Sequence, residues 1–391
     1  MRAVGRRGGG AADGPAADRF RGGMGRVARW VGLSGWRAGL AVTATAAGAL
    51  LVVAALAGGR GGGRRLMPGP GGTMPQIIGF YENGWSSIFR SSFSSVRAHA
   101  NVIDTVLAFW YSVDGSGTLQ AHQPNASVTQ WVKQHGMRMG VLVNNVGGGS
   151  GNNAGMLTDP TARTAAVRAI RNLVQADGYQ EVNIDFEMLN PSARGGMVSF
   201  MQQLRTALPT SVSLSASVFP KIGVPASLNG AYDYTQLAKY VNYLVIMLYD
   251  NHSSGGPSGP VSPWPWVVQN MNWFLHTAKI PASKLVLAAG VYGYDWPAGS
   301  TTAAELPLTA INSLAKSTGA TVHVDAASKN PYFRYTAADG TAHVVWFQNK
   351  ETVVQRLQLA QKLHLHGVAI WALGEETPAV WSGIVETWGT K

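Results

Sequence analysis

Residues 182–187 read VNIDFE, a short apolar segment that carries a polar side chain at every second position. Side chains in a β-strand alternate between two faces, so Asn183, Asp185 and Glu187 share one face and the three apolar residues share the other. Burying unpaired carboxylates is costly. The pattern therefore indicates either a paired structural site or a place where chemistry happens.

This segment is one of eight apolar runs that are rich in β-forming residues. Stretches with helical spacing separate most of them, such as TARTAAVRAIRNLVQ (161–175) and ETVVQRLQLAQKL (351–363). Alternating strands and helices predict a parallel sheet covered by helices. Eight such units favour a (β/α)8 TIM barrel over a doubly wound sheet, which would need fewer strands and a glycine-rich phosphate loop after the first one. The predicted strands are 76–82, 102–113, 138–145, 181–187, 211–218, 243–250, 284–295 and 367–374.

Two glycine-rich or irregular stretches interrupt this pattern. Gly147, Gly148 and Gly149 lack the spacing of a nucleotide-binding loop, and we interpret them as a flexible loop at the barrel mouth. Between the last two strands lie about 71 residues, where 20 to 30 would suffice. Residues 296–348 contain a short helical pattern and a hairpin, YFRYTAADGTAHVVWF, with its turn at Asp339-Gly340. They predict a small α+β insertion that forms a wall of the substrate cleft, or else an insertion without ligand contacts.

The net charge of +11 does not point to a nucleic acid partner. Up to Arg65 the chain has eleven Arg, no Lys and two Asp, so the remaining 20 basic and 18 acidic residues carry only +2. After Arg65 no basic patch interleaved with aromatic residues is present, and a nucleic acid partner is not expected. The chain has no cysteine, which excludes disulfides and thiolate sites.

The N-terminal region predicts export. Residues 38–59 carry no charge and are long enough to cross a bilayer, while residues 1–37 form a basic disordered leader and residues 60–74 a Gly/Arg-rich linker. Eight Arg precede the apolar segment and three follow it, which places the domain at 75–391 outside the cytoplasm. The segment is expected to be a transmembrane anchor or a cleaved signal, and the sequence leaves both open. We expect an extracytoplasmic, membrane-anchored or secreted monomer.

Polar and aromatic residues collect at the predicted strand ends, where barrel enzymes place their sites. They include Tyr81, Asn145, Asp185, Glu187, Tyr249, Asp250, Tyr292 and Trp371. Aromatic rings mixed with carboxylates and amides are typical of a carbohydrate cleft. The nine His are dispersed, and neither a metal site nor a cofactor is expected.

VNIDFE resembles the fourth-strand signature of glycoside hydrolase family 18, the chitinase and N-acetylglucosaminidase family. MLYD (247–250) resembles the sixth-strand motif of that family, and the Trp of AIWALG (369–374) resembles its eighth-strand Trp. The stretches 249–267 and 284–296 are similar to the branch that contains spore cortex-lytic enzymes. The resemblance covers about residue 75 to the C-terminus.

The resemblance implies a role for each matching residue. Glu187 would be the general acid and base, Asp185 would orient the 2-acetamido group of the substrate, and Tyr249 would hold its carbonyl oxygen as it attacks the anomeric carbon. This substrate-assisted route needs no enzyme nucleophile. Trp371 would form the floor of the sugar site. Further substrate-binding residues would be Asn183, Asp250, Asn145, Tyr81 and Tyr292.

Two features depart from the chitinase pattern. Asn183 stands where many chitinases have an aspartate, which favours the spore-type branch. Gln180-Glu181 replaces the usual Asp-Gly and could shift the start of the strand slightly. The expected function is cleavage of β-1,4 bonds in N-acetylglucosamine-containing peptidoglycan, with spore cortex as the expected polymer. The alternatives are a chitinase and a non-catalytic carbohydrate-binding barrel.

Overall fold

The barrel is closed by eight parallel strands, as the sequence predicts. In this computed structural model, which describes residues 75–145 and 155–391, the order is β1-β14-β8-β7-β6-β5-β4-β2, and β2 pairs with β1 to close the ring. A short strand, β3 (Leu119–Ala121), pairs antiparallel with the C-terminal end of β2. The barrel strands are β1 (Gln76–Tyr81), β2 (Thr105–Val113), β4 (Arg138–Asn144), β5 (Glu181–Asp185), β6 (Ser213–Val218), β7 (Tyr243–Ile246), β8 (Leu285–Gly290) and β14 (Gly367–Trp371).

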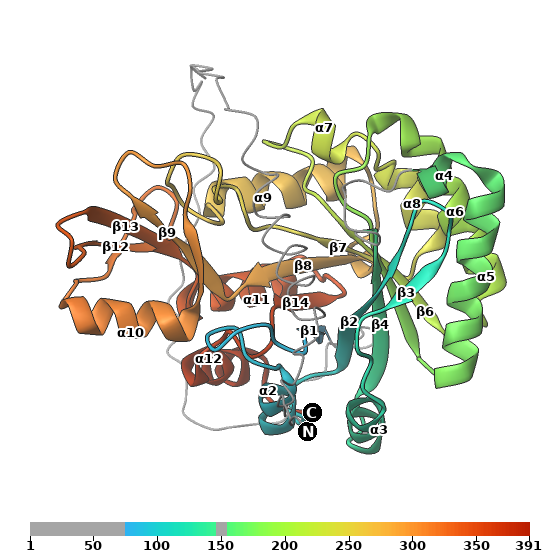
Figure 1. Cartoon of the computed structure of the whole chain (residues 1–391), viewed down its shortest axis with the longest axis horizontal. Helices are drawn as coiled ribbons and strands as arrows, with labels where there is room; N and C mark the ends of the chain where they lie inside the picture. Colours follow the sequence, from blue (N-terminus) through green and yellow to red (C-terminus); the bar gives the residue numbers. More distant parts are fainter. Residues whose placement is uncertain (1–74, 146–154) are drawn as a thin grey trace, which may run out of the picture.

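Helices cover the outside of this barrel (Figure 1). The longest helix of the described residues, α5, has start and stop signals in its own sequence. Asp159 caps its first turn by accepting a hydrogen bond from Thr161 N at 2.7 Å, and Pro160 occupies its first position. Gly178, at φ +64°, ends the helix. The helices are α2 (Phe93–Ala98), α3 (Ala126–Gln134), α4 (Gly155–Thr158), α5 (Pro160–Asp177), α6 (Arg194–Ala207), α7 (Ala226–Asn229), α8 (Tyr234–Tyr240), α9 (Trp264–Asn272), which continues as a π-helical turn (Trp273–Thr277), α11 (Lys350–Lys362) and α12 (Pro378–Trp388).

Two separate hydrophobic layers follow from the alternation along each strand. Val182, Ile184 and Phe186 point outward into the layer between sheet and helices, where the Phe186 ring lies 5.2 Å from that of Phe200 in α6. Full burial of such a side chain contributes roughly 1.5–3 kcal/mol. A smaller cluster, which includes Ile78, Phe80, Leu107 and Val286, fills the barrel interior.

The predicted insertion is present as a second sheet of five antiparallel strands. Its order is β10-β9-β13-β12-β11, and in Figure 1 it projects with α10 from the side of the barrel opposite α5 and α6. The predicted hairpin is confirmed, with Gly340 at φ +85° in its turn. The elements are β9 (Tyr292–Pro297), β10 (Ala304–Pro307), α10 (Leu308–Thr318), β11 (His323–Val324), β12 (Pro331–Thr336) and β13 (Ala342–Phe347).

The boundary of the insertion differs from the prediction. The run 284–295 is not one barrel strand: β8 ends at Gly290, and the chain turns at Val291 into β9, which pairs with β10 and β13. Periodicity alone shows that a run is extended, but not which sheet it joins. The insertion sheet therefore begins at Tyr292.

The predicted leader, apolar segment, linker and triple-glycine loop all lie outside the described residues. Within 75–145 and 155–391, no helix has both the length and the apolar character needed to cross a bilayer.

Candidate active site

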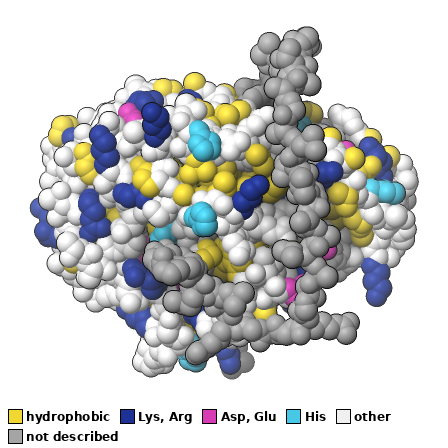
Figure 2. All heavy atoms as spheres, turned by 180° about the vertical axis from the view of Figure 1, so that it is seen from behind, with side chains coloured by type: hydrophobic (Ala, Val, Ile, Leu, Met, Phe, Trp, Pro, Cys, Tyr) yellow, Lys and Arg dark blue, Asp and Glu magenta, His cyan; other side chains and the backbone are white. Residues whose placement is uncertain are grey.

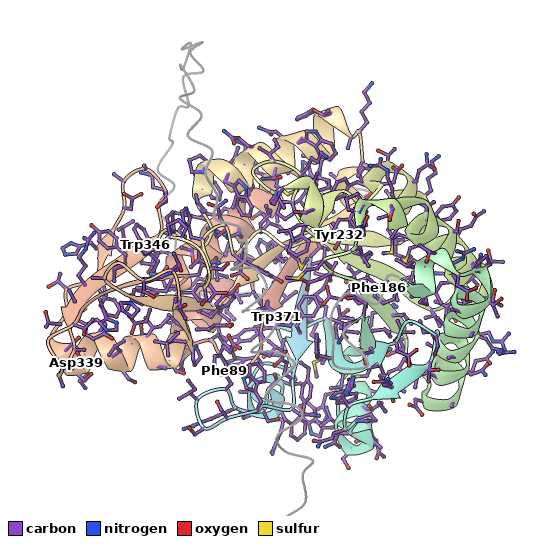
Figure 3. All side chains as sticks on the ribbon, turned by 45° about the horizontal axis from the view of Figure 1, so that its top comes forward. Phe89, Phe186, Tyr232, Asp339, Trp346 and Trp371 are labelled. Carbon is purple, nitrogen blue, oxygen red and sulfur yellow. The ribbon has the colours of Figure 1, made fainter. Side chains whose placement is uncertain are left out.

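The carboxylates of VNIDFE lie at the C-terminal end of β5, inside the barrel mouth. Asp185 is the last residue of the strand and is buried, whereas Glu187 follows two residues later and keeps part of its surface accessible. Phe186, between them, points to the opposite face, and its carbonyl accepts a hydrogen bond of 2.7 Å from Tyr232 OH. Figure 3 shows Phe186 and Tyr232 together on one side of Trp371. This bond fixes the backbone that presents the two acids.

A polar ladder occupies the barrel interior beneath the carboxylates. Asn183 donates through Nδ2 to Ser215 Oγ at 3.0 Å and accepts through Oδ1 from Ser217 Oγ at 3.0 Å. Ser215 in turn donates to Glu181 Oε1 at 2.9 Å, and Tyr243 OH donates to the same oxygen. Both the nitrogen and the oxygen of the Asn183 side chain therefore bond within the protein. We infer a positioning role for it, rather than the substrate contact that the sequence suggested.

Asp185 has a free acceptor. Its Oδ1 atom is buried and finds no hydrogen-bond partner among the described residues. Burial raises the pKa of Asp185 to about 7, and the pKa of Glu187 is raised well above its usual value by burial first and then by repulsion from Asp185 and Asp250. Two acids that repel each other in this way keep one proton near neutral pH. The pair can thus provide one proton donor and one acceptor.

Asn145 braces the acid instead of facing outward. Its Oδ1 accepts from Glu187 N at 3.0 Å, and its Nδ2 donates to Glu187 O at 2.9 Å. Both side-chain atoms therefore hold the backbone of Glu187. These two bonds support a positioning role for Asn145, and the substrate hydrogen bond that the sequence suggested stays a prediction.

A neighbouring part of the mouth, two strands from β5, is built from aromatic residues and Asp250. Tyr249 follows β7, and its ring meets that of Tyr292 edge-on at 6.1 Å. Burial is the largest effect that raises the pKa of Tyr249, followed by the charges of Asp185 and Glu187, so its hydroxyl remains a donor. Asp250 Oδ1 accepts from Tyr292 OH at 2.6 Å and from Tyr294 OH at 2.9 Å. Tyr292 thus orients Asp250 from the first strand of the insertion.

Asp250 is exposed to solvent, although many protein atoms lie around its carboxyl group. Burial still raises its pKa to about 6, while the hydrogen bonds from Tyr292 and Tyr294 lower it. Accessible surface on a crowded side chain is expected on the wall of a cleft. Asp250 also has φ +56°, an uncommon backbone conformation for a residue other than glycine.

Trp371 lies on the side of the barrel that faces the insertion (Figure 3). It ends β14, and its ring packs at 5.3 Å from Phe80 and 6.0 Å from Phe109, while part of it remains accessible. Its position fits the predicted floor of a sugar site.

Tyr81 is the predicted site residue that the structure does not bring to this cleft. Phe80 points into the barrel, so Tyr81 points outward, where its ring meets Trp110 edge-on at 5.5 Å and its hydroxyl lies 3.4 Å from Ser91 Oγ. The strand-end position alone suggested Tyr81, and the alternation of side chains along β1 would have excluded it.

Sequence reasoning missed several polar residues of the barrel mouth and interior. Period-two alternation could have found some of them, because the serines of β6 and the acid that opens β5 point inward in the same way as Asn183. The others come from distant segments that only the fold brings together. The missed residues are Glu82, Glu181, Ser215, Ser217, Tyr232, Glu305, Gln348 and Glu375.

Comparisons with known proteins agree with this architecture. The sequence model described as "Glycosyl hydrolases family 18" matches residues 76–376. This chain belongs to glycosyl hydrolase family 18.

The names of the similar proteins refer to different polymers. The "Cortical fragment-lytic enzyme" of Bacillus subtilis is 29% identical over 235 residues, which cover 58% of this chain and 54% of that protein. The chain thus matches about half the length of this curated relative. Crystal structures of a Bacillus cereus spore cortex-lytic enzyme, SleL, and of a Chromobacterium violaceum chitinase are both 23% identical, each with a TM-score of 0.73. The first match covers 82% of this chain and 76% of that chain, and the second covers 80% and 98%. The fold therefore does not distinguish cortex from chitin.

Proposed function

We propose that this domain hydrolyses β-1,4 bonds next to N-acetylglucosamine in peptidoglycan, with spore cortex as the expected polymer. The observation that carries the proposal is the pair Asp185 and Glu187, on the same face of one strand end, with the buried Oδ1 of Asp185 free. Two acids on one strand cannot flank a sugar from opposite sides. The nucleophile must then come from the substrate, and a 2-acetamido group supplies it.

The proposed steps follow from the positions of three side chains. Glu187 donates its proton to the glycosidic oxygen as the bond to the anomeric carbon breaks. The acetamido carbonyl oxygen forms the new bond to that carbon, while Asp185 accepts from the amide N–H and Tyr249 OH donates to the carbonyl oxygen. Glu187, now ionised, then takes a proton from the water that opens the cyclic intermediate, so the anomeric configuration is retained.

A direct comparison of substrates tests the polymer. Spore cortex fragments and chitin oligomers would be digested side by side, with product masses as the readout. Products from cortex fragments support the proposal, and products from chitin alone would favour the chitinase function.

The variant Glu187→Gln separates an enzyme from a carbohydrate-binding barrel. It keeps the shape of the side chain but removes the donated proton, so turnover should be lost while binding persists. If the wild-type chain binds N-acetylated polymers and cleaves none of them, the enzymatic proposal is wrong.

The location of the domain is part of the proposal. The names of two relatives state that they lyse cortical fragments and spore cortex, and residues 38–59 would export or anchor this chain. Fractionation of cells that express the full chain, followed by N-terminal sequencing of the mature protein, would distinguish a membrane anchor from a cleaved signal. A protein found wholly in the cytoplasm would contradict both. A sedimentation measurement on the full chain tests the expectation of a monomer.

A further inference from the structure

A second group of carboxylates lies beside Asp250 in the barrel mouth. Glu82 follows β1 and Glu375 follows β14, and these two strands are paired neighbours. Glu305 comes from β10 of the insertion, where it is paired with Tyr294, the residue whose hydroxyl donates to Asp250. Burial and then repulsion from Glu305 raise the pKa values of both Glu82 and Glu375, so the three carboxyls are close enough to interact.

Several buried polar atoms of this group have no partner among the described residues. They are both carboxylate oxygens of Glu82, one of Glu375, and the side-chain nitrogen and oxygen of Gln348. Gln348 is fully buried, and its Nε2 lies 3.1 Å from the point where a Cβ on Gly290 would sit. Gly290 ends barrel strand β8, so the amide is directed into the mouth. Unsatisfied groups of this kind in a native protein indicate a ligand, a water or an ion.

No cation of the protein neutralises these carboxylates in the described ranges. Ion pairs there involve Asp233, Asp295 and Glu386, but none of the acids at the barrel mouth. The surface has a different balance, since Lys and Arg outnumber Asp and Glu on the face shown in Figure 2. Within the same ranges, no three acidic or histidine side chains converge closely enough to hold a metal ion. The cation that fits such a dispersed group is organic and carries its own hydrogen-bond donors.

We propose that Glu305, supported by Glu82 and Glu375, binds a protonated amine on the sugar next to the cleaved N-acetyl unit. Partly de-N-acetylated glycans would then be preferred substrates. An ammonium group has three donors and forms strong charge-assisted bonds with carboxylates, whereas an acetylated neighbour presents only a neutral amide. This inference rests on the proposed function, because Asp185 and Glu187 define where the N-acetyl unit lies, and the charge of Asp250 acts on both Glu187 and Glu305.

Glu305 is the residue that can meet the amine. It keeps part of its surface accessible, whereas Glu82 and Glu375 are buried. Burial and the charge of Asp250 raise the pKa of Glu305 to about 8, so it holds a proton near neutral pH. An arriving ammonium favours the ionised form, and binding should release this proton.

Calorimetry with two glycans of equal length tests the proposal. One is a fully acetylated N-acetylglucosamine oligomer, and the other has a single free amine next to the N-acetyl unit at the cleavage position. Both are titrated into the full chain carrying Glu187→Gln, which prevents turnover. The amine-bearing oligomer should bind roughly tenfold more tightly, and its heat should vary among buffers in the way proton release requires.

Adding Glu305→Gln should reduce the preference to less than about twofold and remove the proton release. The same substitution at Glu386, a surface residue paired with Lys350, should change neither. Equal binding of both oligomers, or an equal loss of binding to both in Glu305→Gln, would overturn the inference while leaving the proposed function intact. If neither oligomer binds and neither is cleaved by the wild-type chain, both proposals fail.

Discussion

Asn145 offers a sharp test of the site, because sequence and structure assign it different roles. The structure shows both of its side-chain atoms on the backbone of Glu187, at 3.0 and 2.9 Å. The change Asn145→Ala removes both bonds and frees the segment that carries the acid. We therefore expect kcat to fall strongly while KM changes little.

The magnitude follows from the two lost bonds. Each contributes about 0.5–1.5 kcal/mol net, so unfolding free energy should fall by about 1–3 kcal/mol in total. If Glu187 shifts by even ~1 Å, the misplacement of the acid costs roughly 100-fold in rate. The loss in kcat should thus exceed what partial unfolding of the chain explains.

Steady-state kinetics and urea unfolding on the same samples measure both quantities. Asn125→Ala is a matched control, since the Asn125 side chain also makes two hydrogen bonds to backbone, accepting from the N–H groups of Ser127 and Val128 at the start of α3. It should lose comparable stability with kcat preserved. A rise in KM with unchanged kcat in Asn145→Ala would mean that Asn145 contacts substrate in the ground state, and the positioning role would be refuted.

Three further changes test the electrostatics and packing of the cleft. Tyr292→Phe removes a bond that lowers the pKa of Asp250, so that pKa should rise above about 6 in a carboxyl NMR titration; no rise would contradict the hydrogen bond. Gly290→Ala would place a Cβ 2.6 Å from a Tyr292 ring carbon, and we expect kcat/KM to fall and stability to drop by about 1–3 kcal/mol; full activity would mean that the ring can move freely. Glu82 and Glu375 have pKa values that are raised in the folded state, so their contribution to the stability of the fold is present below the unfolded-state pKa and is lost as pH rises through the folded-state pKa. The melting temperature should therefore fall with rising pH, and Glu82→Gln should make that fall less steep. An unchanged slope of melting temperature against pH in Glu82→Gln would contradict this prediction.

The sequence was sufficient for the barrel because each strand leaves a local pattern. All eight predicted runs contain a barrel strand, and the two quoted helical stretches, 161–175 and 351–363, correspond to α5 and α11. The division of residues 284–295 into β8 and β9 could not be predicted from the sequence, because Tyr292 pairs with Pro307 in the insertion and no local pattern encodes that pairing.

The site was predictable in part, for the same physical reason. Asp185 and Glu187 are recognisable from their strand alone, and correct use of alternation would have replaced Tyr81 with Glu82 on the inner face of β1. Glu305 and Gln348 were not predictable, because they reach the mouth only through the folding of the insertion.

Asn183 shows how the barrel interior and the chemistry are linked. The position lies between Glu181 and Asp185 on one face of β5, so an aspartate there would place a third carboxyl in line within a buried space. An amide can instead donate to Ser215 and accept from Ser217 at the same time, and it satisfies both hydroxyls without a charge. The coupling that raises the pKa of Glu187 is then supplied from this strand by Asp185. The uncharged contacts of Asn183 with Ser215 and Ser217 below the acids hold β5 against β6 and leave proton exchange to the pair at the strand end. Asn183, in place of the aspartate of many chitinases, is therefore consistent with Glu187 acting as a general acid. The kinetics of Glu187→Gln and Asn145→Ala test the function of the pair Asp185 and Glu187.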